Sequence, residues 1–338
     1  MLIESYLKHG FQRVKLENVV SSWGPLKKGV PQGSVVGPQC FNVYINDLLL
    51  QLDENVIPAN YADDNRVSVI TNSKEEDLEQ ISQLVSNLTK WFTDNLMKAN
   101  VDKFQFMLFC PSTSENKEIV TVNVNGIILK SQNEGKLLGI NIEKDLTFNN
   151  HIRIVCTKAN AKILALRRML NFLTEDCKLA VLRSFIICHF MYCCILLHFG
   201  SKVLRDKMEK ILYRGLKLVY KDYESSYEQL LNKAKMDNVE LVRQKAIICE
   251  MFKCLHETGP EYMNDIFKVS KHISRRGPIF HEPRVHTARY GSHSLRAYGP
   301  KLWNNLSTSI KLSKSIDELK RNLKDFKGNP CKCAQCRC

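Results

Sequence analysis

Two adjacent aspartates interrupt a stretch that otherwise has the pattern of paired β-strands. Asp63 and Asp64 lie within YADDNRVSVI, and residues 56–70 follow a pattern of strand, turn and strand. A carboxylate buried between strands is costly unless it is paired, hydrogen-bonded or bound to a metal. If the flanking runs are buried strands, as their composition indicates, the pair marks either a solvated hairpin turn or a site for divalent cations.

Composition indicates a globular chain of two or three domains. The sequence has 338 residues, 44% of them hydrophobic and 25% charged, which is ample material for a core. The first ten residues, MLIESYLKHG, carry charges where a signal peptide needs an apolar run. The most apolar stretch, residues 185–199, is shorter than the roughly 20 residues that cross a bilayer. We therefore expect an intracellular chain, nuclear or cytoplasmic and not secreted, with no membrane partner and with residues 185–199 as a buried helix.

The positive charge is concentrated in the second half of the chain. The formal net charge is +14, made up of −4 in residues 1–150 and +18 in residues 151–338. A basic half joined to a mildly acidic one predicts a polyanionic partner, with nucleic acid the leading candidate. A basic domain that is merely soluble remains the alternative.

Residue patterns predict an α+β chain. Residues 29–39 must form a loop, residues 40–52 and 74–100 have helical periodicity, and helices are expected from Asn149 to Lys268. Residues 271–300 are rich in Arg, His, Gly, Pro and Tyr and are expected to be extended, and residues 315–326 are expected to form a helix capped by Ser315, with Glu318 three residues on. Strands are expected at residues 12–20 with a turn at Glu17–Asn18, 103–110, 118–130 and 136–142.

Four motifs resemble those of a known family. GVPQGSVVGPQCFNVYINDL, YADD, NLMKANVDKFQFMLF and KLLGINIEKDLTFNNHI follow one another as in the reverse transcriptase of a jockey-like non-LTR retrotransposon. The resemblance implies an α+β fold in which a truncated polymerase palm of antiparallel strands with packed helices precedes an α-helical, thumb-like region. It places the partial palm in residues 1–145, a helical thumb and connection in 146–270, a basic C-terminal segment in 271–328 and a Cys-rich tail in 329–338.

The same resemblance implies an RNA-directed DNA polymerase that transfers nucleotides with two metal ions. Asp63 would be the main ligand of Mg²⁺ or Mn²⁺ and Asp64 its neighbour, because such a site needs carboxylates that hold cations about 4 Å apart. Lys103 would be catalytic and assist the departure of pyrophosphate, although Phe104 follows it where relatives have threonine. The partners would be an RNA template, a DNA primer and deoxynucleotides; the oligomeric state stays open.

Further residues receive roles from the resemblance alone. Those that would border the nucleotide and template are Pro31, Gln32, Gly33, Ser34, Tyr61 and Ala62, and those of the primer grip are Leu137, Leu138 and Gly139. Each assignment has a plainer alternative: an ordinary Gly/Pro loop, a solvated lysine at a strand edge for Lys103, and a buried strand end for the primer grip.

One part of the family's metal site is absent from this sequence. Such polymerases use three metal-binding aspartates, the first from a motif before GVPQGS, but the only acids before Asp47 are Glu4 and Glu17. We therefore expect Met1 to fall after that first aspartate and the chain as it stands to be an inactive or incomplete polymerase, since losing one member of a catalytic unit costs orders of magnitude in rate. The alternatives are a non-catalytic nucleic-acid-binding remnant and a product with no function of its own.

The C-terminal part offers two further candidate features. Arg284, Arg289 and Arg296 are interleaved with aromatic residues and could contact phosphates, whereas Trp303 is expected to dock on the helical region. The tail CKCAQCRC could hold zinc, but its spacing is tighter than that of zinc knuckles and no histidine follows. We therefore expect no zinc site at Cys331, Cys333, Cys336 and Cys338.

Overall fold

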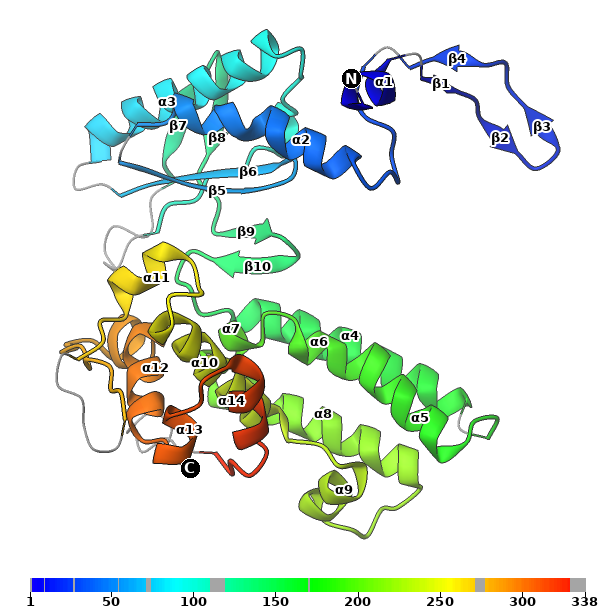
Figure 1. Cartoon of the computed structure of the whole chain (residues 1–338), viewed down its shortest axis with the longest axis vertical. Helices are drawn as coiled ribbons and strands as arrows, with labels where there is room; N and C mark the ends of the chain where they lie inside the picture. The colour runs from blue at the N-terminus through cyan, green and yellow to red at the C-terminus, as the bar shows by residue number, and fades with distance from the viewer. Residues whose placement is uncertain are drawn as a thin grey trace. The chain divides into compact units, whose positions relative to one another are not determined.

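The chain forms two compact units, each of which is described by itself (Figure 1). The computed structural model describes residues 2–8, 10–26, 28–53, 55–70, 74–109, 119–169, 171–270 and 277–328, without the side chains of residues 2, 74–77 and 289. The N-terminal unit comprises Met1–Leu108 and Glu118–Gln132, and the helical unit comprises Phe109–Lys117 and Asn133–Cys338. The fold is a mixture of helices and short antiparallel strand pairs, as expected. The four domains predicted from the sequence stay a prediction.

The N-terminal unit contains short strands and two longer helices. Its elements are α1 (Leu2–Leu7), β1 (Phe11–Gln12), β2 (Lys15–Leu16), β3 (Val19–Val20), β4 (Gly24–Pro25), α2 (Gly37–Ile45), the 3₁₀-helix η1 (Asn46–Gln51), β5 (Val56–Tyr61), β6 (Asp64–Val69), α3 (Lys74–Asp94), the 3₁₀-helix η2 (Val101–Lys103), β7 (Thr121–Val124) and β8 (Ile127–Lys130).

Hairpins account for most of the strand pairing in this unit. β5 pairs with β6, β7 with β8 and β2 with β3, each pair antiparallel and two-stranded, and the predicted turn at Glu17–Asn18 joins β2 to β3. Asn125 and Gly126 connect β7 to β8 with φ values of 50° and 84°. Positive φ at both central residues is what a type I′ turn requires, so an Asn-Gly pair fits this hairpin.

The core of the N-terminal unit is small. α3 packs against β7 and η1, and Ile45, Leu48 and Trp91 are its buried centre. The amphipathic helix predicted at residues 74–100 is confirmed but ends at Asp94. The expectation of buried strands around the aspartates is wrong, because Val56 is the only buried residue of β5 and none of β6 is buried.

Two other expectations for this unit need correction. The helix predicted at residues 40–52 begins at Gly37 and changes after Ile45 into the 3₁₀-helix η1. The strand predicted at residues 103–110 does not form among its described residues, where Phe106 makes one isolated bridge to Ser131.

The helical unit begins with one hairpin and continues as helices. Its elements are β9 (Glu134–Leu137), β10 (Ile140–Glu143), α4 (Asn149–Met169), α5 (Glu175–Val181), the π-helix η4 (Leu182–Ile187), α6 (Cys188–Met191), α7 (Cys194–His198), α8 (Lys202–Tyr220), α9 (Tyr227–Ala234), α10 (Val239–Leu255), α11 (Glu261–Ile266), the π-helix η5 (Ala288–Ser292), α12 (Leu295–Asn304), α13 (Thr308–Lys311) and α14 (Ile316–Asn322). The predicted helical region from Asn149 onward is confirmed.

The larger core of this unit lies among α4, η4, α8 and α9. The apolar face of α4 is buried through Ile152, Val155, Cys156, Ala159, Ile163 and Leu166. Burying one such aliphatic side chain contributes about 1.5–3 kcal/mol, so this face alone fixes α4 in place. α8 approaches η4 closely at Gly215, where a Cβ would lie 2.5 Å from Leu182 Cδ1. A side chain at this position would therefore have to displace the fully buried Leu182.

A second core is built on α10. Ile247, Ile248 and Met251 of α10 pack with residues of α12 and α14, including Trp303, which is fully buried. Trp303 Nε1 donates a hydrogen bond to the carbonyl oxygen of Pro278 at 3.1 Å. The docking predicted for Trp303 is thus confirmed.

The apolar stretch at residues 185–199 is a broken helix rather than one buried helix. The π-helix η4 is followed directly by α6, which ends at Met191. The chain then turns at Tyr192 and Cys193, and Cys193 has a left-handed φ of 47°. Phe185 and Tyr192 remain 56% and 51% exposed. No helix within the described residues is long and apolar enough to span a membrane.

The C-terminal expectations are met in part. The basic segment predicted to be extended, residues 271–300, is not extended throughout, since the π-helix η5 and the start of α12 occupy its second half. α14 begins at the predicted cap, where Ser315 Oγ accepts a hydrogen bond from the backbone N–H of Glu318 at 3.2 Å. The Glu318 carboxylate accepts from the backbone N–H of Lys314 at 2.8 Å, one residue before the position of a standard capping box.

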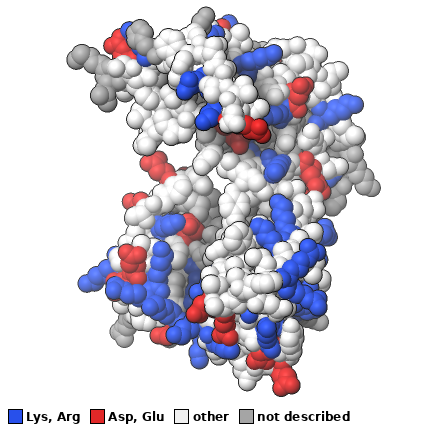
Figure 2. Space-filling model, turned by 90° about the vertical axis from the view of Figure 1, so that its right-hand side faces the viewer, with Lys and Arg blue, Asp and Glu red and all other residues white. Residues whose placement is uncertain are grey.

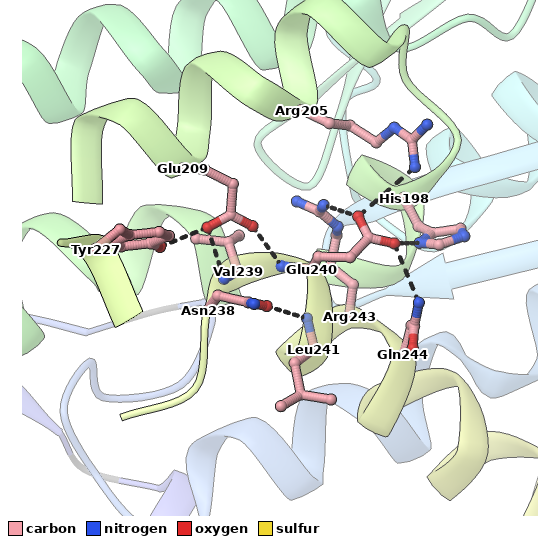
Figure 3. A network of polar contacts seen from close by, with 10 residues as sticks. All are labelled: His198, Arg205, Glu209, Tyr227, Asn238, Val239, Glu240, Leu241, Arg243 and Gln244. Atoms are coloured by element: carbon pink, nitrogen blue, oxygen red, sulfur yellow. Dashed lines mark hydrogen bonds and ion pairs between the residues drawn. The ribbon is translucent and has the colours of Figure 1, made fainter. Parts of the chain in front are cut away.

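A single carboxylate joins three helices of this unit (Figure 3). Glu209 of α8 accepts hydrogen bonds from the backbone N–H groups of Val239 and Glu240 at 3.1 and 2.7 Å and from the hydroxyl of Tyr227 in α9 at 2.6 Å. The first N–H groups of a helix have no partner within the helix, and they carry the positive end of its dipole. Glu209 therefore caps α10 with a full negative charge.

A second carboxylate, Glu240 in the first turn of α10, neutralises buried cations (Figure 3). It accepts a hydrogen bond from the fully buried Arg243 and lies 3.6 Å from Arg205 Nη1. Burial disfavours its ionised form, but the charges of Arg243 and Arg205 outweigh this and lower the pKa of Glu240. His198 Nδ1 lies 3.5 Å from Glu240 Oε1 without the alignment of a hydrogen bond. Burial lowers the pKa of His198 to about 3, with Glu240 opposing the shift and Arg243, Arg205 and His293 adding to it.

Replacing Glu209 by alanine is expected to destabilise the helical unit by about 3 kcal/mol, because it removes three hydrogen bonds and the charge that caps α10. Thermal unfolding followed by circular dichroism measures the loss. The matched control is Glu224→Ala, which removes an exposed acid from the loop between α8 and α9. A Glu209→Ala variant that melts with the control would contradict the role of Glu209 as a cap.

Acidification is expected to destabilise the helical unit between pH 6.5 and about 3. The unfolded chain takes up a proton on His198 below its ordinary pKa of 6.5, whereas the folded chain takes it up only near pH 3. Stability is thus fully present above pH 6.5 and is lost as the pH falls, by up to about 1.4 kcal/mol per pH unit. The lowered pKa of Glu240 acts in the same direction at lower pH. Urea unfolding at several pH values measures the free energy of unfolding. Its change per pH unit between pH 6.5 and 3 should be smaller for His198→Gln than for the exposed control His286→Gln, and equal changes would refute the prediction.

Candidate functional site

The two aspartates lie at the tip of the β5–β6 hairpin. Tyr61 pairs with Asp64 across the strands, which leaves Ala62 and Asp63 as a two-residue turn. Ala62 has a left-handed φ of 52°, and Asn65 Nδ2 donates to the carbonyl oxygen of Asp63 at 3.2 Å. Both carboxylates are exposed. They pay no cost of burial, so the solvated turn and the cation site that the sequence left open are both compatible with this geometry.

Two exposed carboxylates are a suitable but incomplete set of metal ligands. Carboxylate oxygens are the ligands that Mg²⁺ and Mn²⁺ prefer. Within the described ranges, however, no group of three or more His, Cys, Asp or Glu side chains converges on a point where an ion could bind. The turn fits the chemistry of these cations and offers two ligands toward it.

The PQGS loop has a defined shape. Gly33 has a φ of 81°, a conformation that other residues rarely adopt. Ser34 Oγ donates to the carbonyl oxygen of Pro31 at 2.8 Å and accepts from the backbone N–H of Gly37 at 3.0 Å. A Cβ on Gly37 would lie 2.6 Å from Ser34 Oγ, so the loop closes tightly on the start of α2. Gln32 and Gly33 are exposed at its outer edge.

Lys103 is the last residue of the 3₁₀-helix η2. Its backbone N–H donates to the carbonyl oxygen of Asn100 at 3.1 Å, and its side chain is exposed. It therefore lies at the end of a turn and not at the edge of a strand, and its exposure is compatible both with the catalytic assignment and with an ordinary solvated lysine. The PQGS loop, the aspartate turn and Lys103 share the N-terminal unit, but no hydrogen bond joins them among its described side chains.

The predicted primer-grip residues form a tight turn in the helical unit. Leu137 ends β9, and Leu138 and Gly139 follow with φ values of 45° and 84° before β10 begins. The hydroxyl of Tyr192 donates to the carbonyl oxygen of Leu138, and a Cβ on Gly139 would lie 3.9 Å from the Tyr192 ring. Leu138 itself is 40% exposed, so the turn is a supported surface feature and not a buried strand end.

Of the candidate nucleic-acid-binding and zinc-binding residues near the C-terminus, only some lie within the described residues. Arg284 and Arg296 are exposed, and the side chain of Arg289 lies outside the described residues, as do the four cysteines of the tail. Tyr298 is turned inward, with its ring 4.3 Å from that of His198. It is therefore not available for stacking on a base.

Sequence reasoning missed the buried charges of the helical unit. Arg243 is fully buried, and Arg205 and His198 are nearly so. The only signal was the presence of charged residues at positions where the periodicity of α8 and α10 calls for apolar ones. Such a signal cannot show which residues pair, because the partners come from different helices.

Residues 1–142 match the reverse transcriptase (RNA-dependent DNA polymerase) family. Over 193 residues, which are 54% of this chain, the sequence is 26% identical to the RNA-directed DNA polymerase from mobile element jockey of Drosophila melanogaster. Over 181 residues, or 50% of the chain, it is 27% identical to a probable RNA-directed DNA polymerase from transposon BS of the same organism.

A further relative is a retrovirus-related Pol polyprotein from the type-1 retrotransposable element R1 2 of Nasonia vitripennis, 26% identical over 42% of this chain and 36% of its own length. The chain spans only 21% and 19% of the jockey and BS proteins. No solved structure matches it. The resemblance drawn from the four motifs is confirmed: the chain is homologous to the RNA-directed DNA polymerases of jockey and other non-LTR retrotransposons, and its residues 1–142 carry the match to the reverse transcriptase family.

Proposed function

We propose that this chain is part of an RNA-directed DNA polymerase in which the β5–β6 turn holds the metal ions. The observation that carries the proposal is the exposed Asp63–Asp64 pair at the tip of a hairpin, within the segment that matches the reverse transcriptase family. A hairpin tip projects its carboxylates into solvent, where a nucleotide and its cations can reach them.

In this proposal each candidate residue has one task. Asp63 is the main metal ligand and Asp64 supports it, and bound Mg²⁺ or Mn²⁺ would stabilise the charge on the attacking and leaving oxygens. Gly33, at the exposed edge of the PQGS loop, lets the backbone approach the nucleotide. The Lys103 ammonium, exposed at the end of η2, balances the charge of the departing pyrophosphate.

The primer would be held elsewhere in the chain. The turn at Leu138–Gly139 presents backbone at a surface that Tyr192 supports, which suits contact with the end of a DNA primer. Pro31, Gln32, Ser34, Tyr61 and Ala62 would border the RNA template and the deoxynucleotide. These assignments come from the homologous motifs, and the exposure of Gln32 and Tyr61 is compatible with them.

Two carboxylates are too few for two cations held in fixed geometry. Each ion needs several oxygen ligands, and ligands that bridge both ions fix their separation. The sequence offers no aspartate before Asp47. We therefore propose that these residues by themselves bind the cations weakly and do not extend a primer.

The second candidate function is nucleic-acid binding without catalysis. The observation in its favour is the net charge of +18 in residues 151–338, which would attract phosphates whether or not the metal site works. Binding of this kind weakens steeply with salt and needs no magnesium.

The expected result of primer extension on a primed RNA template is no addition by this chain alone, in Mg²⁺ or in Mn²⁺. Extension should appear when the segment of the jockey polymerase that precedes the matched region is fused ahead of Met1, since that segment is expected to supply the missing carboxylate. The fusion carrying Asp63→Asn and Asp64→Asn should lose extension by at least about 10³-fold, as expected for removal of metal ligands from a catalytic unit. A gel assay of a labelled primer measures each rate.

The matched control is the fusion with Asp94→Asn, which removes another exposed carboxylate of the same unit, at the end of α3. It should extend like the unmodified fusion. A folded fusion that extends equally well with and without Asp63 and Asp64 would refute the metal assignment. Extension by the chain alone would refute the proposed need for a third carboxylate.

A further inference from the structure

The turn between β7 and β8 has a sequence that is chemically labile. Asn125 is the only asparagine of the chain that is followed by a glycine, Gly126. Both residues are exposed, and a Cβ on Gly126 would meet no atom within 4 Å. The backbone nitrogen of a glycine can reach the side-chain amide of the preceding residue, because glycine has no side chain to hinder the approach and adopts many backbone conformations. The turn therefore holds a nucleophile and an electrophile in adjacent residues.

The reaction between these two groups consumes water and releases ammonia. The backbone nitrogen of Gly126 loses its proton and bonds to Cγ of Asn125. The bond from Cγ to Nδ2 breaks, and Nδ2 leaves as ammonia with the proton that the nitrogen gave up. Water then opens the resulting cyclic imide at either of its carbonyl carbons. One opening gives aspartate, and the other gives isoaspartate, whose main chain passes through the former side chain and is longer by a methylene group.

In the folded unit, hydrogen bonds engage both reacting groups. The backbone N–H of Gly126 donates to Asn123 Oδ1 at 3.0 Å. Asn125 Nδ2 donates to Thr89 Oγ1 of α3, also at 3.0 Å. The Thr89 hydroxyl uses its own proton to donate to the carbonyl oxygen of Val85 at 2.9 Å, so its oxygen can only accept from the amide. The attack on Cγ therefore requires the turn to open first.

The same turn fixes the pairing of β7 with β8. The length and type of the turn set the register of a hairpin, and this register decides which side chains of β7 are buried. β7 packs against α3, and its residues Val122 and Val124 are only 2% and 1% exposed. A main chain lengthened by a methylene group does not fit a two-residue turn, so isoaspartate at position 125 would disturb this register. Aspartate would keep the main chain but lose the donor to Thr89.

We propose that Asn125 is a site of spontaneous deamidation that its contact with Thr89 holds in check, and that conversion to isoaspartate destabilises the N-terminal unit. The modification needs water and neither an enzyme nor a cofactor. Its rate follows the fraction of chains in which the hairpin is open, because the closed turn engages both reacting groups. The inference does not depend on any activity of the Asp63–Asp64 turn, although that turn belongs to the same unit.

The test incubates the whole chain in neutral buffer and follows the peptide that contains Asn125 by mass spectrometry, with an isoaspartyl methyltransferase as the probe for isoaspartate. The variant Thr89→Val removes the acceptor and keeps the shape of the side chain. Deamidation at Asn125 should be about fivefold faster in it, which is the factor that one typical hydrogen bond contributes to the opening equilibrium. In concentrated urea, where every hairpin is open, the two rates should be equal and higher than in the folded chain.

The matched control is Thr93→Val, which removes the same hydroxyl from the next turn of α3, where it donates to the carbonyl oxygen of Thr89 at 3.0 Å. It should deamidate as the unmodified chain does. Equal rates in the two folded variants would overturn the protective role of Thr89. If circular dichroism showed that Thr89→Val had lost helix content, Asn123→Ala would take its place, because it frees the N–H of Gly126 and should also speed the reaction.

Two further outcomes bear on the proposal. A folded chain in which Asn125 reacts as fast as it does in urea would overturn the dependence on opening. The isoaspartyl chain, separated from the unmodified chain by ion exchange, should unfold at a lower urea concentration. Equal unfolding of the two forms would overturn the effect on the N-terminal unit.

Discussion

The carboxylate of Glu209 is the point on which the arrangement of the helical unit depends. It joins α8, α9 and the start of α10 through three hydrogen bonds. α10 is in turn shared by the two cores of the unit, because Val239 at its start belongs to the first core and Ile247, Ile248 and Met251 to the second. A cap that fixes the first turn of α10 therefore also fixes the side chains that follow it. Among these is Glu240, which neutralises Arg243 and Arg205.

Local sequence patterns predicted those features of the fold that depend on interactions between residues close together in the chain. The start of α4, the Ser315 cap of α14 and the turn at Glu17–Asn18 were predicted because caps, periodicity and turn residues act within a few positions of the chain. Residues 185–199 were predicted wrongly as one helix. The break at Cys193 requires a left-handed conformation that nothing in its composition signals, and it is compensated by packing of α7 on α10.

For the candidate site, too, the sequence predicted the local features and missed those that depend on packing. Motif spacing singled out Asp63, Asp64 and the PQGS loop. The structure places the two aspartates at the tip of a hairpin as expected, with Asp63 in the two-residue turn and Asp64 as the first residue of β6. Sequence could not show that the strands behind them are exposed, because burial depends on what packs against a strand and not on the strand's own residues. Nor could it show the buried Arg243, whose partner Glu240 and neighbour Arg205 depend on how α8 meets α10.

The two sides of α8 show how charge is used for different ends. On the inner side, Glu209 has every partner it needs, and that arrangement stabilises the fold. Lysine and arginine side chains gather over the helical unit in Figure 2. On the outer side, Lys207, Lys210 and Arg214 follow one another at steps of three and four residues, and a like-charge pair four residues apart costs a few tenths of a kcal/mol. Glutamate at one or two of these positions would remove that cost without touching the core.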